Sequence, residues 1–218
     1  MSAFVDGLPF ELSSSGATLW LDAEVAMDRV GVLAAVIDIV AGRLAVGALT
    51  PRWAATRDLV IAFSSNVPDG PLEVSGQVRD LGRGRVLTYL VVASNNEIVA
   101  SAEVGLVVQA GVVPALHSQQ RSPRNLSVAD EWLPVSGPLT VDERHIHAGG
   151  IAEGGLLAMY AARSSGLSRL PRTTALRFLT PGRIGRIDAT ATDSGGCRVE
   201  LSQTSPEGVG TVMSAWFV

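Results

Sequence analysis

The chain has 218 residues, of which 47% are hydrophobic and only 17% are charged, and its formal net charge is −4. This composition excludes a disordered chain, and the length suits two domains of about 100 residues each. The sequence contains no basic run and no basic stripe interleaved with aromatic residues, which argues against nucleic-acid binding.

The first half of the sequence predicts one strand, one long apolar helix and four further strands. A β-prone segment at 17–21 precedes Val30–Leu49, the most apolar stretch of the chain. Segments bounded by turn residues follow, and each is typical of a strand. These segments are Asp58–Phe63, Leu72–Val78, Val86–Ala93 and Ile98–Val108.

The apolar stretch is almost long enough to cross a bilayer, so a membrane span has to be weighed. Asp38 and Arg43 lie inside it, and three glycines interrupt it. Ionisable residues are costly within a membrane, and a helix that is apolar on nearly all faces is also typical of the core of a soluble domain. We therefore predict a buried helix and no membrane partner.

The second half repeats this order of elements. A strand at Leu139–Val141 and a glycine-rich turn lead into a helix predicted from about Gly155 to Ser165. Four more strands are predicted at Ala175–Leu179, Ile187–Thr192, Arg198–Ser202 and Thr211–Val218. The turns between them are too short for helical crossovers, so these strands must be antiparallel neighbours.

A shared register supports an internal repeat. Phe63 and Phe178 are each followed by a glycine seven residues later, and each glycine is followed by an acidic residue three positions on. We therefore predict an α+β fold with two domains, residues 1–110 and 131–218, joined by a linker at 111–130 that has little hydrophobic periodicity. One mixed α+β domain is the alternative.

The predicted helix starts carry the most informative residues. Glu153-Gly154-Gly155 opens the second helix, and His147 precedes it by six positions. Arg29-Val30-Gly31 holds the same place in the first half, and Asp38 follows eight positions after the middle residue of that triplet. The position that corresponds to Asp38 in the second half is Ala162.

Together with the element order, these residues resemble the hotdog fold, and more narrowly the acyl-CoA thioesterases of the phenylacetate-pathway type and their 4-hydroxybenzoyl-CoA relatives. The signature of that family is an Asn, a His-Gly-Gly at the helix start and an acidic residue eight positions after the first glycine. The resemblance implies a double hotdog, in which two antiparallel sheets, each around a central apolar helix, form a pseudo-dimer. The first half keeps the acid without the paired glycines, and the second keeps the glycines without the acid.

Thioester hydrolysis needs donors aimed at the carbonyl oxygen. The first N–H groups of a helix lack internal partners and lie at the positive end of the helix dipole. Gly154 and Gly155 leave room for a carbonyl to approach these groups, because glycine has no Cβ. The alternative is that the two glycines only allow a tight turn into the helix.

Asp38 is the only carboxylate in the first helix, and its neighbours three and four positions away are all Ala or Gly. Small neighbours leave room for a ligand, and burial would raise the pKa of the carboxyl toward a value useful for a general base. We therefore expect Asp38 to act as general base or nucleophile. The alternative is a helix acid that is capped by backbone donors or reaches solvent.

In the family that the chain resembles, the acid of one subunit works with the helix start of the other. The resemblance therefore implies one complete site, with Asp38 facing Gly154 and Gly155. The other site, which pairs Ala162 with the Val30–Gly31 helix start, is expected to be inactive. His147, in place of the family Asn, is an accessory candidate that could donate a hydrogen bond or carry a proton.

Weaker signals remain. Arg83 and Arg85 flank a glycine in a predicted turn and are candidates for contacts with coenzyme A phosphates, although a solvated turn is the simpler interpretation. His145-Ile146-His147 would place two imidazoles on one face of a strand, but without a third ligand motif it is a weak metal signal, so no metal site is predicted.

The function predicted from these features is hydrolysis of an acyl-CoA thioester at a single site between the two halves. No cofactor is expected beyond the coenzyme A of the substrate itself, and homo-oligomers of the pseudo-dimer are possible. The single cysteine, Cys197, and the lack of a signal-peptide pattern at the N-terminus favour the cytoplasm. The alternatives are an acyl-CoA-binding module without catalysis and, less favoured, a double-hotdog hydratase.

Overall fold

The structure, a computed structural model, describes residues 8–21, 29–50, 52–64, 66–109, 132–134, 136–146, 150–193 and 195–218. The first half contains β1 (Phe10–Leu12), β2 (Gly16–Leu21), α2 (Arg29–Leu49), β3 (Trp53–Phe63), β4 (Gly70–Gly82), β5 (Arg85–Ser94) and β6 (Glu97–Gln109). The second half contains β7 (Leu139–Val141), the 3-10 helix η3 (Glu143–His145), α4 (Gly154–Ser164), β8 (Thr173–Phe178), β9 (Gly185–Asp193), β10 (Cys197–Ser205) and β11 (Gly208–Phe217). Both predicted helices and all predicted strands are present, whereas β1 and η3 were not predicted.

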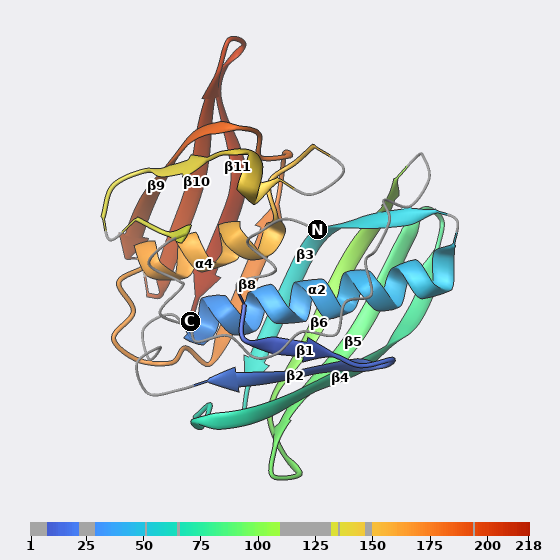
Figure 1. Ribbon diagram of the computed structural model, residues 1–218. Coiled ribbons are helices and arrows are strands. Elements are labelled where there is room, and N and C mark those ends of the chain that lie inside the picture. Colours follow the sequence, from blue (N-terminus) through green and yellow to red (C-terminus); the bar gives the residue numbers. More distant parts are fainter. Residues whose placement is uncertain are drawn as a thin grey trace.

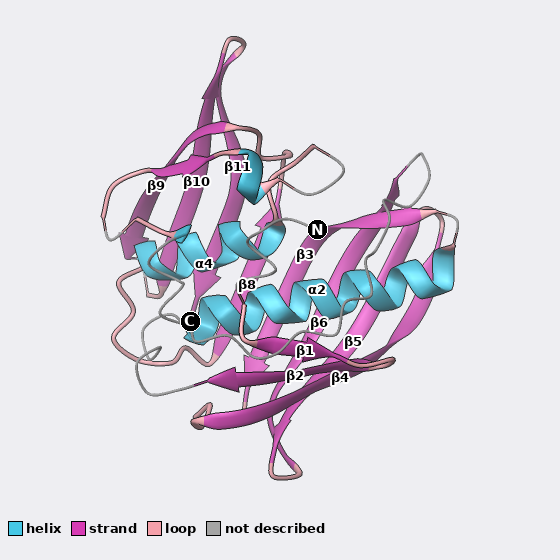
Figure 2. Ribbon diagram, in the orientation of Figure 1, coloured by secondary structure: helices cyan, strands magenta, loops and turns pink. Residues whose placement is uncertain are grey.

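The strands form one antiparallel sheet that curves around both helices (Figures 1 and 2). Its order is β1-β2-β4-β5-β6-β3-β8-β11-β10-β9-β7. The two predicted sheets are joined into one, because β3 and β8 pair from Asp58↔Arg177 to Ala62↔Thr173 and make the sheet continuous. This pairing satisfies the backbone groups of two strands that would otherwise be exposed edges.

The strand order is the same in both directions from the β3–β8 pair. It runs through β6, β5, β4 and β2 on one side and through β11, β10, β9 and β7 on the other. The two glycines of the predicted register, Gly70 and Gly185, open β4 and β9 with positive φ angles of 99° and 136°. Glycine suits both positions because it adopts positive φ without a steric penalty.

The two halves also share an irregularity in the sheet. The pairing of β5 with β6 skips Val99, and the pairing of β10 with β11 skips Val212. The carbonyl of each skipped residue accepts a backbone hydrogen bond from the same half of the chain. The donor is the residue that directly follows β3 in the first half and β8 in the second. Ser64 N–H donates to Val99 at 3.0 Å, and Leu179 N–H donates to Val212 at 2.9 Å. The halves thus match in local hydrogen bonding as well as in strand order.

The apolar character of α2 follows from its position. The helix is long and apolar enough to cross a membrane. It lies across β3, β6 and β5 of the first half, however, and its N-terminal part also packs against α4 (Figure 1). Every residue from Val30 to Ile37 is buried as a result. A helix segment that is enclosed in this way has no need of a polar face.

Candidate active site at the crossing of two helices

The carboxylate of Asp38 lies against the first residue of α4. A Cβ built on Gly154 would stand 2.8 Å from Oδ2 of Asp38 and 3.4 Å from Cε1 of Phe178. Only glycine allows this approach of the helix start to the carboxylate without a displacement. The structure therefore brings together Asp38 and Gly154, which lie 116 positions apart in the sequence, and adds Phe178, which the sequence analysis did not single out.

Thr56, on β3, holds the other oxygen of the carboxylate. Its hydroxyl donates to Oδ1 of Asp38 at 2.5 Å. The strand has a bulge here, because Thr56 pairs with Leu106 and the next paired residue is Asp58. Bulges re-aim side chains and are common beside active sites. The sequence analysis missed Thr56 because it began this strand at Asp58, beyond the bulge.

The surroundings of Asp38 change its acidity. The side chain is half-buried. Burial raises the pKa of Asp38 from 3.8 to about 6, although the hydrogen bond from Thr56 opposes part of the rise. Desolvation favours the neutral acid, whereas a donor to the carboxylate favours the ion. The result is a carboxyl group that exchanges its proton close to neutral pH, as a general base requires.

The start of α4 presents free donors. Glu153 is the N-cap residue and makes no side-chain hydrogen bond to the helix backbone. No acceptor for the N–H groups of Gly154 or Gly155 is found in the described parts of the chain. Because the dipole of the helix adds partial positive charge at this end, these groups can bind a carbonyl oxygen on which negative charge develops.

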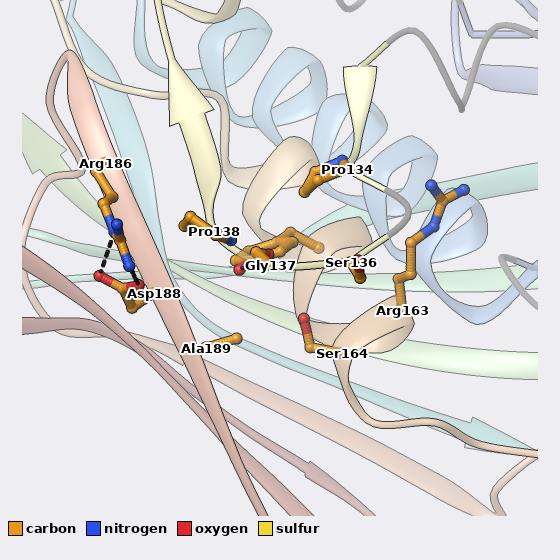
Figure 3. Close-up of a pocket in the computed structure, with 10 residues that line it drawn as sticks. Pro134, Ser136, Gly137, Pro138, Arg163, Ser164, Arg186, Asp188 and Ala189 are labelled. Carbon is orange, nitrogen blue, oxygen red and sulfur yellow. Dashed lines mark hydrogen bonds and ion pairs between the residues drawn. The ribbon is translucent and has the colours of Figure 1, made fainter.

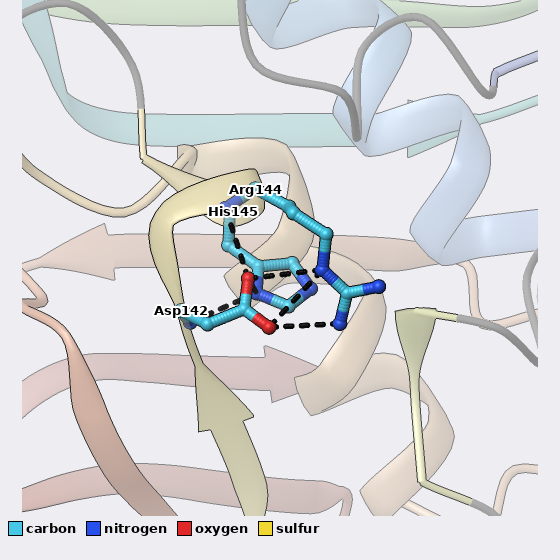
Figure 4. Close-up of polar contacts among 3 residues, drawn as sticks. All are labelled: Asp142, Arg144 and His145. Carbon is cyan, nitrogen blue, oxygen red and sulfur yellow. Dashed lines mark hydrogen bonds and ion pairs between the residues drawn. The ribbon is translucent and has the colours of Figure 1, made fainter.

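His145 stabilises the turn that precedes α4. It is only 3% exposed, and burial lowers the pKa of its imidazole, so that the ring is neutral at pH 7. Nδ1 accepts the N–H of Asp142 at 3.0 Å, and Arg144 pairs with the carboxylate of Asp142 (Figure 4). The carbonyl of His145 accepts the N–H of Glu153 at 3.0 Å. His145 therefore holds the turn that precedes α4.

The expectation that His145 and His147 form a pair on a strand face is corrected in part. His145 lies in η3, with its ring buried against Trp132 at a centroid distance of 5.4 Å. His147 lies outside the described residues. Within the described ranges, no group of three His, Cys, Asp or Glu side chains could hold a metal ion.

The helices α2 and α4 also contact each other at Gly31, and we call this contact the second crossing. Its contacts differ from those at Asp38 and Gly154. A Cβ on Gly31 would stand 2.7 Å from Cα of Met159 and 3.2 Å from Cβ of Ala162. The space is filled by backbone and methyl groups, and Ala162 offers no carboxylate. The guanidinium of Arg29, at the start of α2, is paired with Asp69. This crossing is also closely packed, but an alanine, Ala162, stands where the first crossing has the carboxylate of Asp38.

Arg83 and Arg85 lie at the exposed turn between β4 and β5. Arg85 pairs with Val107, which in turn pairs with Ala55, the neighbour of Thr56. At about 4.8 Å per strand, the backbone of Arg85 is about 10 Å from that of Ala55. The turn is thus at the same end of the sheet as Thr56, and neither arginine has an ion-pair partner among the described side chains.

A separate cavity of about 400 Å³ lies on another side of α4 (Figure 3). It is bordered by the end of α4, the segment around Gly137 and strand β9. Tyr160 donates to the carbonyl of Gly137 at 2.9 Å, and Arg186 pairs with Asp188 on the opposite wall. None of the residues predicted for the active site lines this cavity.

No protein-family model matches the chain, and no curated protein matches its sequence. Solved structures do match over nearly the whole chain. A tesB protein of Mycobacterium avium subspecies paratuberculosis is 14% identical with a TM-score of 0.61, and the match covers 99% of this chain and 98% of that one. An acyl-CoA thioesterase II, TesB2, of Mycobacterium marinum is 12% identical with a TM-score of 0.59, and the match covers 97% and 95%.

A third similar structure is a conserved protein with a hotdog fold from Alicyclobacillus acidocaldarius. It is 13% identical with a TM-score of 0.57, and the match covers 99% of this chain and 96% of that one. At such low identities the likeness concerns the fold. The chain therefore has a hotdog fold, as the element order predicted.

Proposed function

We propose that the chain is a double-hotdog thioesterase that hydrolyses an acyl-CoA or related thioester where α2 and α4 cross. The observation that carries the proposal is the carboxylate of Asp38, which accepts a hydrogen bond from Thr56 and lies against Gly154, the first residue of α4. The matching strand order of the halves supports a double hotdog that arose by duplication. Two of the similar structures are described as a tesB protein and an acyl-CoA thioesterase II.

In the proposed mechanism, the thioester oxygen binds the N–H groups of Gly154 and Gly155. Asp38 takes a proton from a water molecule as the water oxygen attacks the carbonyl carbon. The tetrahedral intermediate then collapses, the carbon–sulfur bond breaks, and Asp38 returns the proton to the leaving thiolate. The products are a carboxylic acid and the free thiol. A positioned base contributes about 10²–10⁴ in rate, and one oxyanion donor about 10²–10³.

Thr56 positions the base in this scheme. A carboxylate oxygen that accepts its hydroxyl cannot rotate freely, so the second oxygen stays directed at the helix start. Arg83 and Arg85, which flank one turn at this end of the sheet, are proposed contacts for the phosphates of coenzyme A. Arginine suits phosphate because its planar donors match the oxygens. His147 is kept as a proposed accessory donor.

The test is the release of free thiol from a panel of acyl-CoA thioesters by the wild type and by Asp38→Asn. Asp58→Asn is the matched control, because it makes the same chemical change on β3, two residues after Thr56, where the side chain of Asp58 is 49% exposed. Asp38→Asn is expected to lower kcat by about 10²–10⁴, whereas the control keeps wild-type turnover. Wild-type turnover in Asp38→Asn would show that Asp38 is not the base.

A binding module without catalysis is the second candidate function. Glu153 favours it, because a carboxylate beside the start of α4 opposes negative charge on a bound carbonyl oxygen. The two functions differ in one measurement. A binding module would retain an acyl-CoA in titration calorimetry and release no thiol over hours, whereas a thioesterase would release thiol in proportion to the enzyme present.

A further inference from the structure

The exposure of α2 changes beside Asp38. All residues from Val30 to Ile37 are buried, because α4 and the sheet enclose this part of the helix. Asp38 itself and the residues at 39, 42 and 43 are half-exposed. Solvent therefore approaches Asp38 along the C-terminal half of α2. A thioester whose thiol portion is too large to be enclosed needs such an exposed flank.

Gly42 lies on that flank. It follows Asp38 by four residues, so the two positions are one helical turn apart on the same side of α2. A Cβ on Gly42 would meet no atom of the described residues within 4 Å, in contrast to Gly31, whose Cβ would contact the backbone of Met159. Packing therefore does not require glycine at 42, and glycine destabilises a helix interior relative to alanine.

We propose that Gly42 is a specificity-determining residue that keeps this flank open for the arm of a pantetheine-type thiol. The inference rests on the proposed function and narrows its substrate class to thioesters of coenzyme A or of carrier-bound phosphopantetheine. In either case a long flexible arm leaves the thioester at Asp38 and passes over Gly42. Arg43, the next residue, makes no ion pair with a described residue, so its guanidinium is available to the phosphate on such an arm.

The chain offers a matched control in Gly47. Among the parts of the chain that the structure describes, a Cβ on Gly47 also meets no atom within 4 Å. It lies nine residues after Asp38, which places it about 180° around the helix, on the opposite side. Gly42→Phe and Gly47→Phe thus make the same chemical change in the same helix, and only the first puts a ring on the flank next to Asp38.

The experiment measures kcat/KM with one acyl group on two thiols, coenzyme A and N-acetylcysteamine, which lacks the length of the arm. Gly42→Phe is expected to lower kcat/KM for the coenzyme A thioester by at least about tenfold. It should leave the N-acetylcysteamine thioester within about twofold of wild type, and Gly47→Phe should leave both substrates unchanged. Gly42→Leu serves if the phenylalanine variant does not fold.

Equal losses with both thiols would overturn the proposal, and so would a coenzyme A thioester that is unaffected by Gly42→Phe. If the wild type releases no thiol at all, the proposed hydrolysis is wrong. The inference about Gly42 is then tested separately, by measuring the binding of a non-hydrolysable S-alkyl coenzyme A. Weaker binding by Gly42→Phe than by Gly47→Phe then supports it. Equal binding, or none by the wild type, overturns it. Comparing the same acyl group on coenzyme A and on a carrier protein distinguishes the two sources of the arm.

Discussion

The helices α2 and α4 meet at two crossings that occupy matching positions in the two halves. At one crossing the Cβ missing from Gly154 leaves room for the carboxylate of Asp38. At the other crossing the Cβ missing from Gly31 leaves room for the backbone of Met159 and the methyl group of Ala162. Glycine thus makes room for a carboxylate at the first crossing and for backbone and methyl groups at the second. A small residue at a helix start does not by itself distinguish the two uses.

The two crossings also differ in their polar groups. One crossing has an acid, a hydroxyl donor from Thr56 and a helix start without a side-chain cap. The other has alanine at the acid position, and its helix start carries Arg29 paired with Asp69. A buried carboxylate destabilises a fold, so a second acid without a function would lower the stability and bring no benefit. Four experiments sharpen this comparison, from the largest expected effect to the smallest.

Restoring an acid at the second crossing is expected to have the largest effect. Ala162 is 4% exposed and tightly packed, so Ala162→Asp buries a charge without a partner. We expect the free energy of unfolding to fall by about 3–5 kcal/mol at pH 7, as measured in urea. Ala162→Asp should also fail to restore turnover to Asp38→Asn. A stable variant with recovered activity would mean that the second crossing is open to substrate.

Asp38 itself should destabilise the folded protein above its pKa. The folded carboxyl keeps its proton up to about pH 6 and the unfolded one only up to 3.8, so stability falls as the pH rises through this window. The rise from 3.8 to about 6 corresponds to about 3 kcal/mol at pH 7. Asp38→Asn should therefore be more stable than wild type at pH 7 by about this amount, and thermal unfolding at pH 4 should show little difference.

The two glycines at the crossings should respond oppositely to alanine. Gly31→Ala pushes a methyl group against backbone atoms of Met159 and should lower the free energy of unfolding by about 1–3 kcal/mol. Gly154→Ala comes too close only to the end of the Asp38 side chain, which can shift more easily than backbone, and makes ordinary contact with Phe178, so stability should stay within about 1 kcal/mol. Displacing that carboxylate should lower kcat by about 10². Equal stabilities for the two variants would contradict the assignment of one crossing to packing.

Thr56→Val tests the positioning of the base. Valine keeps the shape of threonine but removes the donor that lowers the pKa of Asp38. The pKa should rise above about 6, and the acidic limb of the pH–rate profile should move to higher pH. At pH 7 the rate should fall by about tenfold. Thr50→Val, which alters a hydroxyl at the end of α2, is the control. An unmoved limb would mean that Thr56 does not act on Asp38.

The sequence predicted the elements well because hydrophobic period and turn residues are local signals. The resemblance implied that Asp38 faces Gly154, because in that family the acid of one subunit works with the helix start of the other. The sequence analysis missed Thr56, since the bulge that directs this side chain at Asp38 depends on pairing with β6. It also placed His145 on a strand, because the 3-10 turn depends on a cap from Asp142 that spacing does not reveal.

The sequence by itself determined two repeats of strand, apolar helix and strands, and it determined that only one helix carries an acid. Side-chain alternation and turn chemistry act over a few residues, so they are encoded locally. Only the tertiary structure decided that β3 and β8 join the sheet into one and that Asp38 meets Gly154 while Ala162 is packed against the residues at Gly31. The raised pKa of Asp38 also depends on the tertiary structure, because the desolvation that causes it comes from all the residues packed around the carboxyl group.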